Sequence, residues 1–246
     1  MKFSKNYTVR WHETNANREM TPSAILTLMQ ETTNSHIKEF YPFLEYLRDV
    51  KKQAFILSKI YLRFYEPVSA YDDLVVSTFT GEESRGFTFY RNFTVSKDGK
   101  TVADALSHWA LIDLEGSKLL PVSAFENPFV DEPSLDIEMP RRIKFPADAE
   151  LSLVGEKKIT YSDIDYNLHM NNTHYPNMLL DYLPSPEKLR VKEIMISFIA
   201  GSLYNEDIKI YRADDGDRFY FRTTNADGKT CLEAVILTEA QEGEIK

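Results

Sequence analysis

Residues 161–170 read YSDIDYNLHM and residues 11–20 read WHETNANREM, so the two decapeptides align without a gap at a displacement of 150. The tetrapeptide DGKT occurs at residues 98–101 and again at 227–230, at a displacement of 129. Two matches in the same order indicate an internal duplication. Between these landmarks the second copy is shorter by 150 − 129 = 21 residues.

A proline-rich stretch separates the two copies. Five prolines occupy positions 121, 128, 133, 140 and 146. Because proline breaks helices and cannot donate to a sheet ladder, we interpret this stretch as an extended linker. The predicted organisation is a first copy over residues 1–120, a linker over 121–146 and a second copy over 147–246.

Each copy shows one order of elements: a short strand, a loop rich in Asn and Asp, a helix, and then antiparallel strands. In the first copy Thr21-Pro22 provides an N-cap and a proline at the first helical position, and apolar residues follow at helical spacing. Strands are predicted over 55–65, 74–79, 87–95 and 101–112. In the second copy a shorter helix over 175–182 precedes strands over 193–199, 208–211, 219–224 and 231–238. The pattern predicts an α+β fold with one helix packed on a sheet in each copy.

Charge and composition restrict the classes of function. The formal net charge is −9, which disfavours binding to nucleic acid or to an anionic membrane. Cys231 is the single cysteine, so no intrachain disulfide can form, as is usual in a reducing compartment. The sequence shows no signal peptide and no apolar run near the roughly 20 residues that span a bilayer. We therefore expect a cytoplasmic protein.

The decapeptide of the second copy begins the densest polar run in the chain. If this loop is extended, side chains two apart point the same way, which would align Asp163, Asp165, Asn167 and His169. A helix N-terminus behind them could hold an oxyanion, as acyl-transfer chemistry requires. Taken alone, a loop whose Asx side chains satisfy their own backbone is the more ordinary interpretation.

Calcium is a third interpretation, and the spacing excludes it. Asp163-x-Asp165-x-Asn167 imitates the first three ligands of an EF-hand, which then needs glycine at its sixth position and glutamate at its twelfth. Those positions hold Leu168 and His174. We therefore expect no metal and no cofactor.

The polar run resembles the loop-and-helix signature of plant-type acyl-ACP thioesterases and their bacterial relatives, which share a double hot-dog fold. The D-x-N-x-H element of that family corresponds to Asp165, Asn167 and His169. The resemblance extends over nearly the whole chain through Asn171-Asn172, Tyr175, Val9-Arg10, Gln30-Glu31, His36, Ser107-x-Trp109 and Ile112-Asp113. It implies a tandem hot-dog, with two antiparallel sheets each wrapped around a central helix, that hydrolyses the thioester of fatty acyl-ACP during fatty acid synthesis.

For thioester hydrolysis we assign roles to residues of the second copy. Asp165 is expected to activate water or attack directly, Asn167 to orient water or the thioester oxygen, and His169 to aid proton transfer. Asp163 is a weaker candidate. Backbone amides at Asn171 and Asn172 are expected to hold the oxyanion.

The first copy lacks the histidine, so it is expected to hold the acyl chain. Its residues in the equivalent places are Glu13, Asn15, Asn17 and Glu19. Candidate pocket walls are Met20, Met29, Phe40 and Phe55, although ordinary core explains each of them singly.

One departure from the family pattern affects the predicted chemistry. The family usually carries a glutamate, often followed by cysteine, where this chain has Gly201 and Ser202. Either Asp163, Asp165 or Glu206 replaces that carboxylate, or the protein is slow, or it is no longer a hydrolase. The alternatives are an acyl-CoA thioesterase of the same fold and a non-catalytic acyl-binding protein, and a dehydratase fits the motif less well.

The expected partner, acyl carrier protein, is acidic, so docking requires local positive charge. The best clusters are Arg141, Arg142 and Lys144 in the linker, and Lys157 and Lys158 before the polar run. A solvated surface explains each equally well. Because two hot-dog units already pair within the chain, both a monomer with an internal pseudo-dimer and a homodimer are compatible with the sequence.

Overall fold

A long helix and an antiparallel sheet form the first copy in the computed structural model, which describes residues 2–40, 42–81, 84–129 and 132–241. Helix α1 (Pro22–Lys38) begins after Thr21, whose hydroxyl oxygen accepts the Ala24 N–H at 3.2 Å. The predicted N-cap is therefore confirmed. A short helix α2 (Phe43–Glu45) and a π-helical segment η2 (Tyr46–Val50) follow. The strands are β1 (Phe3–Thr8), β2 (Gln53–Phe64), β3 (Asp73–Thr80), β4 (Phe89–Lys97), β5 (Lys100–Asp113) and β6 (Lys118–Leu120).

The second copy repeats this plan in a shorter form. Its helix α3 (Tyr175–Leu180) has only six residues, since prolines at 184 and 186 follow closely. The strands are β7 (Ser152–Lys158), β8 (Leu189–Phe198), β9 (Asp207–Asp215), β10 (Arg218–Thr224) and β11 (Thr230–Ala240). The helices and strands predicted from the sequence are confirmed, with shifts of a few residues at their ends.

The two sheets join edge to edge into one sheet of 11 strands. The strand order is β1-β3-β4-β5-β2-β8-β11-β10-β9-β7, with β6 attached to β5. From the centre of the sheet outward, the equivalent strands of the two copies follow the same order. This is the pattern of an internal two-fold axis. The junction is the antiparallel β2–β8 pairing, from Lys59↔Ser197 to Arg63↔Glu193, which we call the seam. The expected double hot-dog is present, but with its two sheets continuous.

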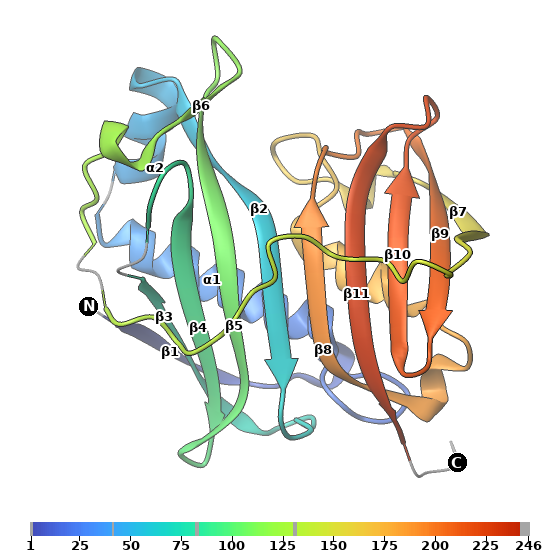
Figure 1. The fold of residues 1–246 in the computed structure, drawn as a ribbon. Helices are drawn as coiled ribbons and strands as arrows, with labels where there is room; N and C mark the ends of the chain where they lie inside the picture. Colours follow the sequence, from blue (N-terminus) through green and yellow to red (C-terminus); the bar gives the residue numbers. More distant parts are fainter. Residues whose placement is uncertain (1, 41, 82–83, 130–131, 242–246) are drawn as a thin grey trace.

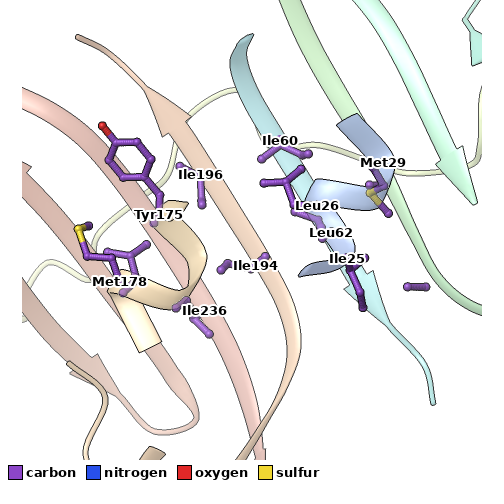
Figure 2. Close-up of a cluster of buried hydrophobic side chains, with 14 of the residues drawn as sticks. Ile25, Leu26, Met29, Ile60, Leu62, Tyr175, Met178, Ile194, Ile196 and Ile236 are labelled. Carbon is purple, nitrogen blue, oxygen red and sulfur yellow. The ribbon is translucent and has the colours of Figure 1, made fainter. Parts of the chain in front are cut away.

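The hydrophobic core lies between the sheet and the helices and crosses the seam. Figure 2 shows α1 residues on one side and α3 residues on the other, with β2 and β8 between them. Ile60 faces Ile196 and Leu62 faces Ile194 in the register of the seam. These four side chains are at most 1% exposed. The two copies therefore share one core rather than packing as separate domains.

The linker crosses the face of the sheet opposite the helices (Figure 1). Apart from η3 (Val122–Ala124), its described residues form no helix and no named strand before β7. Ile143 of the linker is buried with Met195 and Tyr220 on this face. The Lys59 Nζ donates to the carbonyl oxygens of residues 140 and 141, at 3.1 and 2.7 Å. Across the described residues, no helix has the length and apolar character of a membrane span.

Candidate active site

The polar run of the second copy forms a tight turn, and the first copy repeats its two backbone hydrogen bonds. The Asp165 N–H donates to the His169 carbonyl at 2.9 Å, and the Leu168 N–H donates to the Asp165 carbonyl at 3.0 Å. The residues displaced by 150 make the same two bonds, at 2.8 and 2.9 Å. Leu168 and its counterpart Arg18 have φ of 62° and 63°. The duplication seen in the sequence is therefore also a duplication of backbone geometry.

The expectation that this loop is extended is wrong. Residues Tyr161–Asp163 form a 3-10 turn, and the left-handed Leu168 then reverses the chain, so that Ile164 pairs with Met170. Side chains two apart consequently do not share one side. The side-chain oxygen of Asp165 instead accepts the Asn167 N–H at 2.8 Å, as the Asx interpretation predicts.

Asp163 has a structural environment. Its carboxylate accepts the Thr160 N–H and hydroxyl, both at 2.8 Å, and lies 2.9 Å from the Lys157 ammonium. Partial burial opposes ionisation of Asp163, but these hydrogen bonds and the Lys157 charge outweigh it and hold its pKa below the usual value. Asp163 thus caps the turn, and Lys157 is paired with it.

Asp165, Asn167 and His169 all belong to the turn that the pairing of Ile164 with Met170 closes. Asp165 is half-buried, and the other two are exposed. Within the described part of the chain, the Asp165 carboxylate accepts only the Asn167 N–H, which leaves its Oδ2 open. The Asn167 Oδ1 accepts from the Arg48 Nη1 at 2.9 Å. The turn therefore carries a carboxylate, an amide and an imidazole, each of them at least partly exposed.

Gly201 lies directly under the His169 ring. A Cβ at position 201 would stand 2.5 Å from the His169 Cδ2 and 2.9 Å from its Cγ and Nε2. The His169 ring thus fills the space that a side chain at position 201 would enter. The next residue, Ser202, is fully buried, and its carbonyl accepts the Met170 N–H at 2.9 Å.

We predict that Gly201→Ala lowers kcat by at least about 10-fold, because the new methyl group displaces the His169 ring and small misplacements of a reacting group are costly. The ring is exposed and can turn away, so the thermal midpoint should change little. Steady-state kinetics and thermal unfolding of the variant test both points. In a His169→Ala background the methyl group has no ring to displace, and Gly201→Ala should then have no further effect; an equal loss in both backgrounds would contradict this explanation.

Tyr175 and Ser202 are buried next to the turn and are hydrogen-bonded to each other. The Tyr175 hydroxyl donates to the Ser202 Oγ at 3.1 Å, and both side chains are buried. Burial raises the pKa of Tyr175 to about 12, so the phenol stays neutral. These residues were not predicted as part of the site, although Tyr175 belongs to the motif that carried the resemblance.

The two backbone amides predicted to hold an oxyanion, those of Asn171 and Asn172, differ in whether they already have a hydrogen-bond acceptor. The Asn171 N–H donates to the Asp163 carbonyl at 2.8 Å, so it is not available to a substrate. The Asn171 side chain accepts the Thr173 N–H and hydroxyl at 3.0 Å each and thereby caps the following turn. The Asn172 N–H has no acceptor among the described residues, so it alone remains a candidate.

The predicted pocket walls do not lie in one place. Phe40 and Phe55 belong to a cluster of aromatic rings whose centroids are 4.9 to 5.9 Å apart, together with Phe43, Phe89, Phe125 and Phe129. Met29 is fully buried in the core. Met20 instead lines a cavity of about 430 Å³ beside the turn of the first copy.

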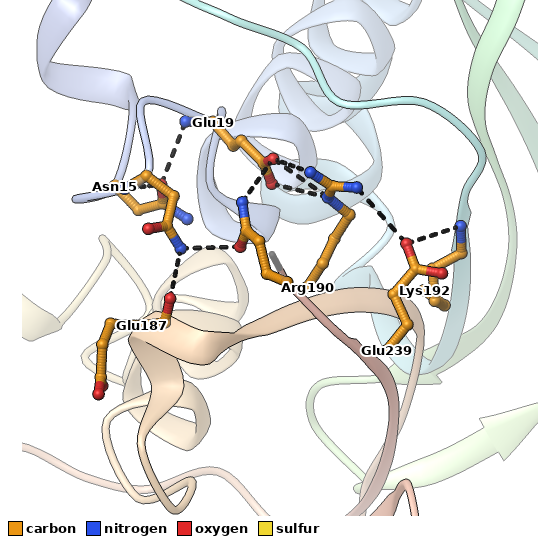
Figure 3. Close-up of polar contacts among 8 residues, drawn as sticks. Asn15, Glu19, Glu187, Arg190, Lys192 and Glu239 are labelled. Carbon is orange, nitrogen blue, oxygen red and sulfur yellow. Dashed lines mark hydrogen bonds and ion pairs between the residues drawn. The ribbon is translucent and has the colours of Figure 1, made fainter. Parts of the chain in front are cut away.

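The turn of the first copy is fixed by polar contacts to the second copy (Figure 3). Glu19, which stands where the second copy has His169, pairs with Arg190 at 2.5 Å and accepts from Gln241 at 2.9 Å. Asn17 donates through its Nδ2 to the Glu187 carbonyl at 2.9 Å and to the Gln241 Oε1 at 2.8 Å. The Glu19 carboxylate is therefore already paired with a cation.

The remaining predicted cations are exposed. Arg141, Arg142 and Lys144 are exposed residues of the linker, and the linker crosses the face of the sheet opposite the helices (Figure 1). Lys158 is exposed at the end of β7. No group of three or more His, Cys, Asp or Glu side chains among the described residues is arranged to hold a metal ion.

The paired copies and the turn at their junction define a double hot-dog of the thioesterase type. Two family models match the chain: the acyl-ACP thioesterase N-terminal domain over residues 1–124 and the acyl-ACP thioesterase C-terminal domain over residues 147–241. The chain therefore belongs to the acyl-ACP thioesterase family.

Two solved structures have nearly the same fold. An acyl-ACP thioesterase from Bacteroides thetaiotaomicron superposes with a TM-score of 0.85 at 20% identity, covering 97% of this chain and 98% of that one. The 12:0-ACP thioesterase from Umbellularia californica gives a TM-score of 0.83 at 16% identity, covering 98% of each chain.

A curated relative is similar in sequence over part of its length. The chloroplastic palmitoyl-acyl carrier protein thioesterase from Cuphea hookeriana is 24% identical over 211 residues, which is 78% of this chain. This alignment spans about half of that relative's length, or 49%.

Proposed function

We propose that the protein hydrolyses the thioester of fatty acyl-ACP, releasing a free fatty acid and holo-ACP, at the turn that carries Asp165, Asn167 and His169. The observation that carries this proposal is the set of three accessible groups on one turn, with the Asp165 Oδ2 unpaired within the described chain. Membership of the acyl-ACP thioesterase family supports the choice of substrate.

In this mechanism Asp165 removes a proton from water, and the resulting hydroxide attacks the thioester carbonyl carbon. The Asn167 Nδ2 and the Asn172 N–H donate to the oxygen that becomes negative. The carbon–sulfur bond then breaks, and His169 gives a proton to the departing thiolate. The proton that Asp165 took from water passes to His169, which restores both groups. A positioned general base contributes about 10²–10⁴ in rate, and one oxyanion donor roughly 10²–10³. These contributions support hydrolysis without a carboxylate at position 201.

The second copy is the better candidate for the chemistry. Glu19 of the first copy is held by Arg190, and the Asn17 amide nitrogen is already used in two hydrogen bonds. We propose that the first copy contributes the acyl-binding surface, to which the aromatic cluster around Phe40 and Phe55 belongs.

The test is thiol release from a panel of acyl-ACPs of differing chain length, with the matched acyl-CoAs measured in parallel. We expect turnover of acyl-ACP that His169→Ala reduces by at least about 10²-fold. Preferential turnover of acyl-CoA would reassign the carrier. Tight binding of acyl-ACP without turnover by folded protein would replace the hydrolase with an acyl-binding function.

A further inference from the structure

Arg48 reaches from the first copy to the turn of the second copy. It lies on the π-helical segment η2, which Leu47 anchors with a side chain only 5% exposed. The Arg48 Nη1 donates to the Asn167 Oδ1 at 2.9 Å, and its guanidinium carbon lies 4.9 Å from the centroid of the Tyr166 ring. One arginine therefore holds two consecutive residues of the turn, across the junction of the copies.

This contact determines which way the Asn167 amide faces. A guanidinium has only donors, so the Asn167 atom nearest to it must be the oxygen. The amide nitrogen then faces the other way. In the described chain that Nδ2 has no acceptor, which leaves both of its hydrogens for a ligand. No other described residue hydrogen-bonds to the Asn167 side chain, so the contact with Arg48 alone sets the orientation of the amide.

The first copy shows the opposite arrangement at the equivalent asparagine. Asn17 meets two acceptors from the second copy, the Glu187 carbonyl and the Gln241 Oε1. Its Nδ2 is therefore turned toward the protein and fully used. The equivalent asparagine is thus held through its nitrogen in the first copy and through its oxygen in the second copy. Only the arrangement in the second copy leaves an N–H donor for substrate.

We propose that Arg48 is a positioning residue of the active site, which fixes the Asn167 amide so that its Nδ2 donates to the thioester oxygen. This inference rests on the proposed function, because the thioester is its ligand. It also makes the active site a joint product of the two copies, since the first copy supplies the group that orients the second.

The test compares Arg48→Met, which removes the donor, with Arg48→Lys, which retains a donor but not the planar stack on Tyr166. We expect kcat for acyl-ACP to fall about 10- to 100-fold in Arg48→Met, with KM nearly unchanged, because the lost contact acts on the transition state. Arg48→Lys should recover part of that loss. Lys51→Met removes the same charge three residues further along the chain and should leave kcat unchanged.

Three outcomes separate this inference from the proposed function. A rise in KM alone, in both Arg48→Met and Lys51→Met, would assign Arg48 to general electrostatic attraction and overturn the positioning role. Wild-type turnover that Arg48→Met leaves intact would overturn the role of Arg48 and leave the hydrolase standing. Absence of turnover by the wild type would overturn the hydrolase instead.

A structural measurement then tests Arg48 by itself. The side-chain amide NMR signals of Asn167 should shift and broaden in Arg48→Met but not in Lys51→Met. Unchanged signals in Arg48→Met would contradict the orienting contact.

Discussion

Replacing Asp165 with asparagine is expected to lower kcat for thioester hydrolysis by about 10²- to 10⁴-fold, the usual contribution of a general base. The substitution is close to a pure removal of basicity, because an asparagine Oδ1 can still accept the Asn167 N–H that Asp165 accepts at 2.8 Å. The first copy supports this expectation. Asn15 stands in the equivalent place and accepts the Asn17 N–H at 2.9 Å.

The matched control is Asn15→Asp, which makes the reverse exchange in the turn of the first copy. It should leave kcat unchanged, since Glu19 and Asn17 of that turn are already bound to the second copy. Both variants should unfold at the wild-type temperature. Full activity in Asp165→Asn would remove Asp165 from the mechanism and direct attention to Glu206, the other carboxylate considered above.

Leu62→Ala is expected to lower the free energy of unfolding by about 2–5 kcal/mol, the range for a large-to-small change in a close-packed core. Leu62 is fully buried on β2 and faces Ile194 of β8 across the seam. Because the core crosses the seam, we expect one cooperative transition in urea for both copies, with the midpoint lowered.

Val75→Ala on β3 is the control for that experiment, because its side chain is 42% exposed and should cost well under 1 kcal/mol. Circular dichroism and tryptophan fluorescence should report the same midpoint for each protein. Two separate transitions in Leu62→Ala would show that the copies unfold independently and that the seam does not couple them.

The duplication, the caps and most strands could be predicted because their signals are local. The match between residues 11–20 and 161–170 reflects a turn that both copies build with the same backbone hydrogen bonds. The conformation of that turn could not be predicted in full. It depends on a leucine at φ 62°, a region that usually favours glycine or asparagine, so Leu168 gave no sign of the reversal.

Contacts between the two copies could not be predicted from sequence patterns either. Arg48 and Asn167 are 119 residues apart, and no spacing rule relates them. The structural uses of Asp163 and Asn171 could not be predicted from the sequence either. Their residue types suit chemistry, but the structure uses the Asp163 carboxylate and the Asn171 N–H to hold the turn itself.

The close approach of His169 to Gly201 also limits how this protein can evolve. Any residue other than glycine at position 201 brings a Cβ against the imidazole, at 2.5 Å from its Cδ2. A side chain introduced at position 201 of this chain therefore requires the His169 ring to move, and a glutamate there is compatible with His169 only in a rearranged turn. The effect of a substitution at position 201 should therefore depend on which residue stands at position 169, which makes the two positions an epistatic pair.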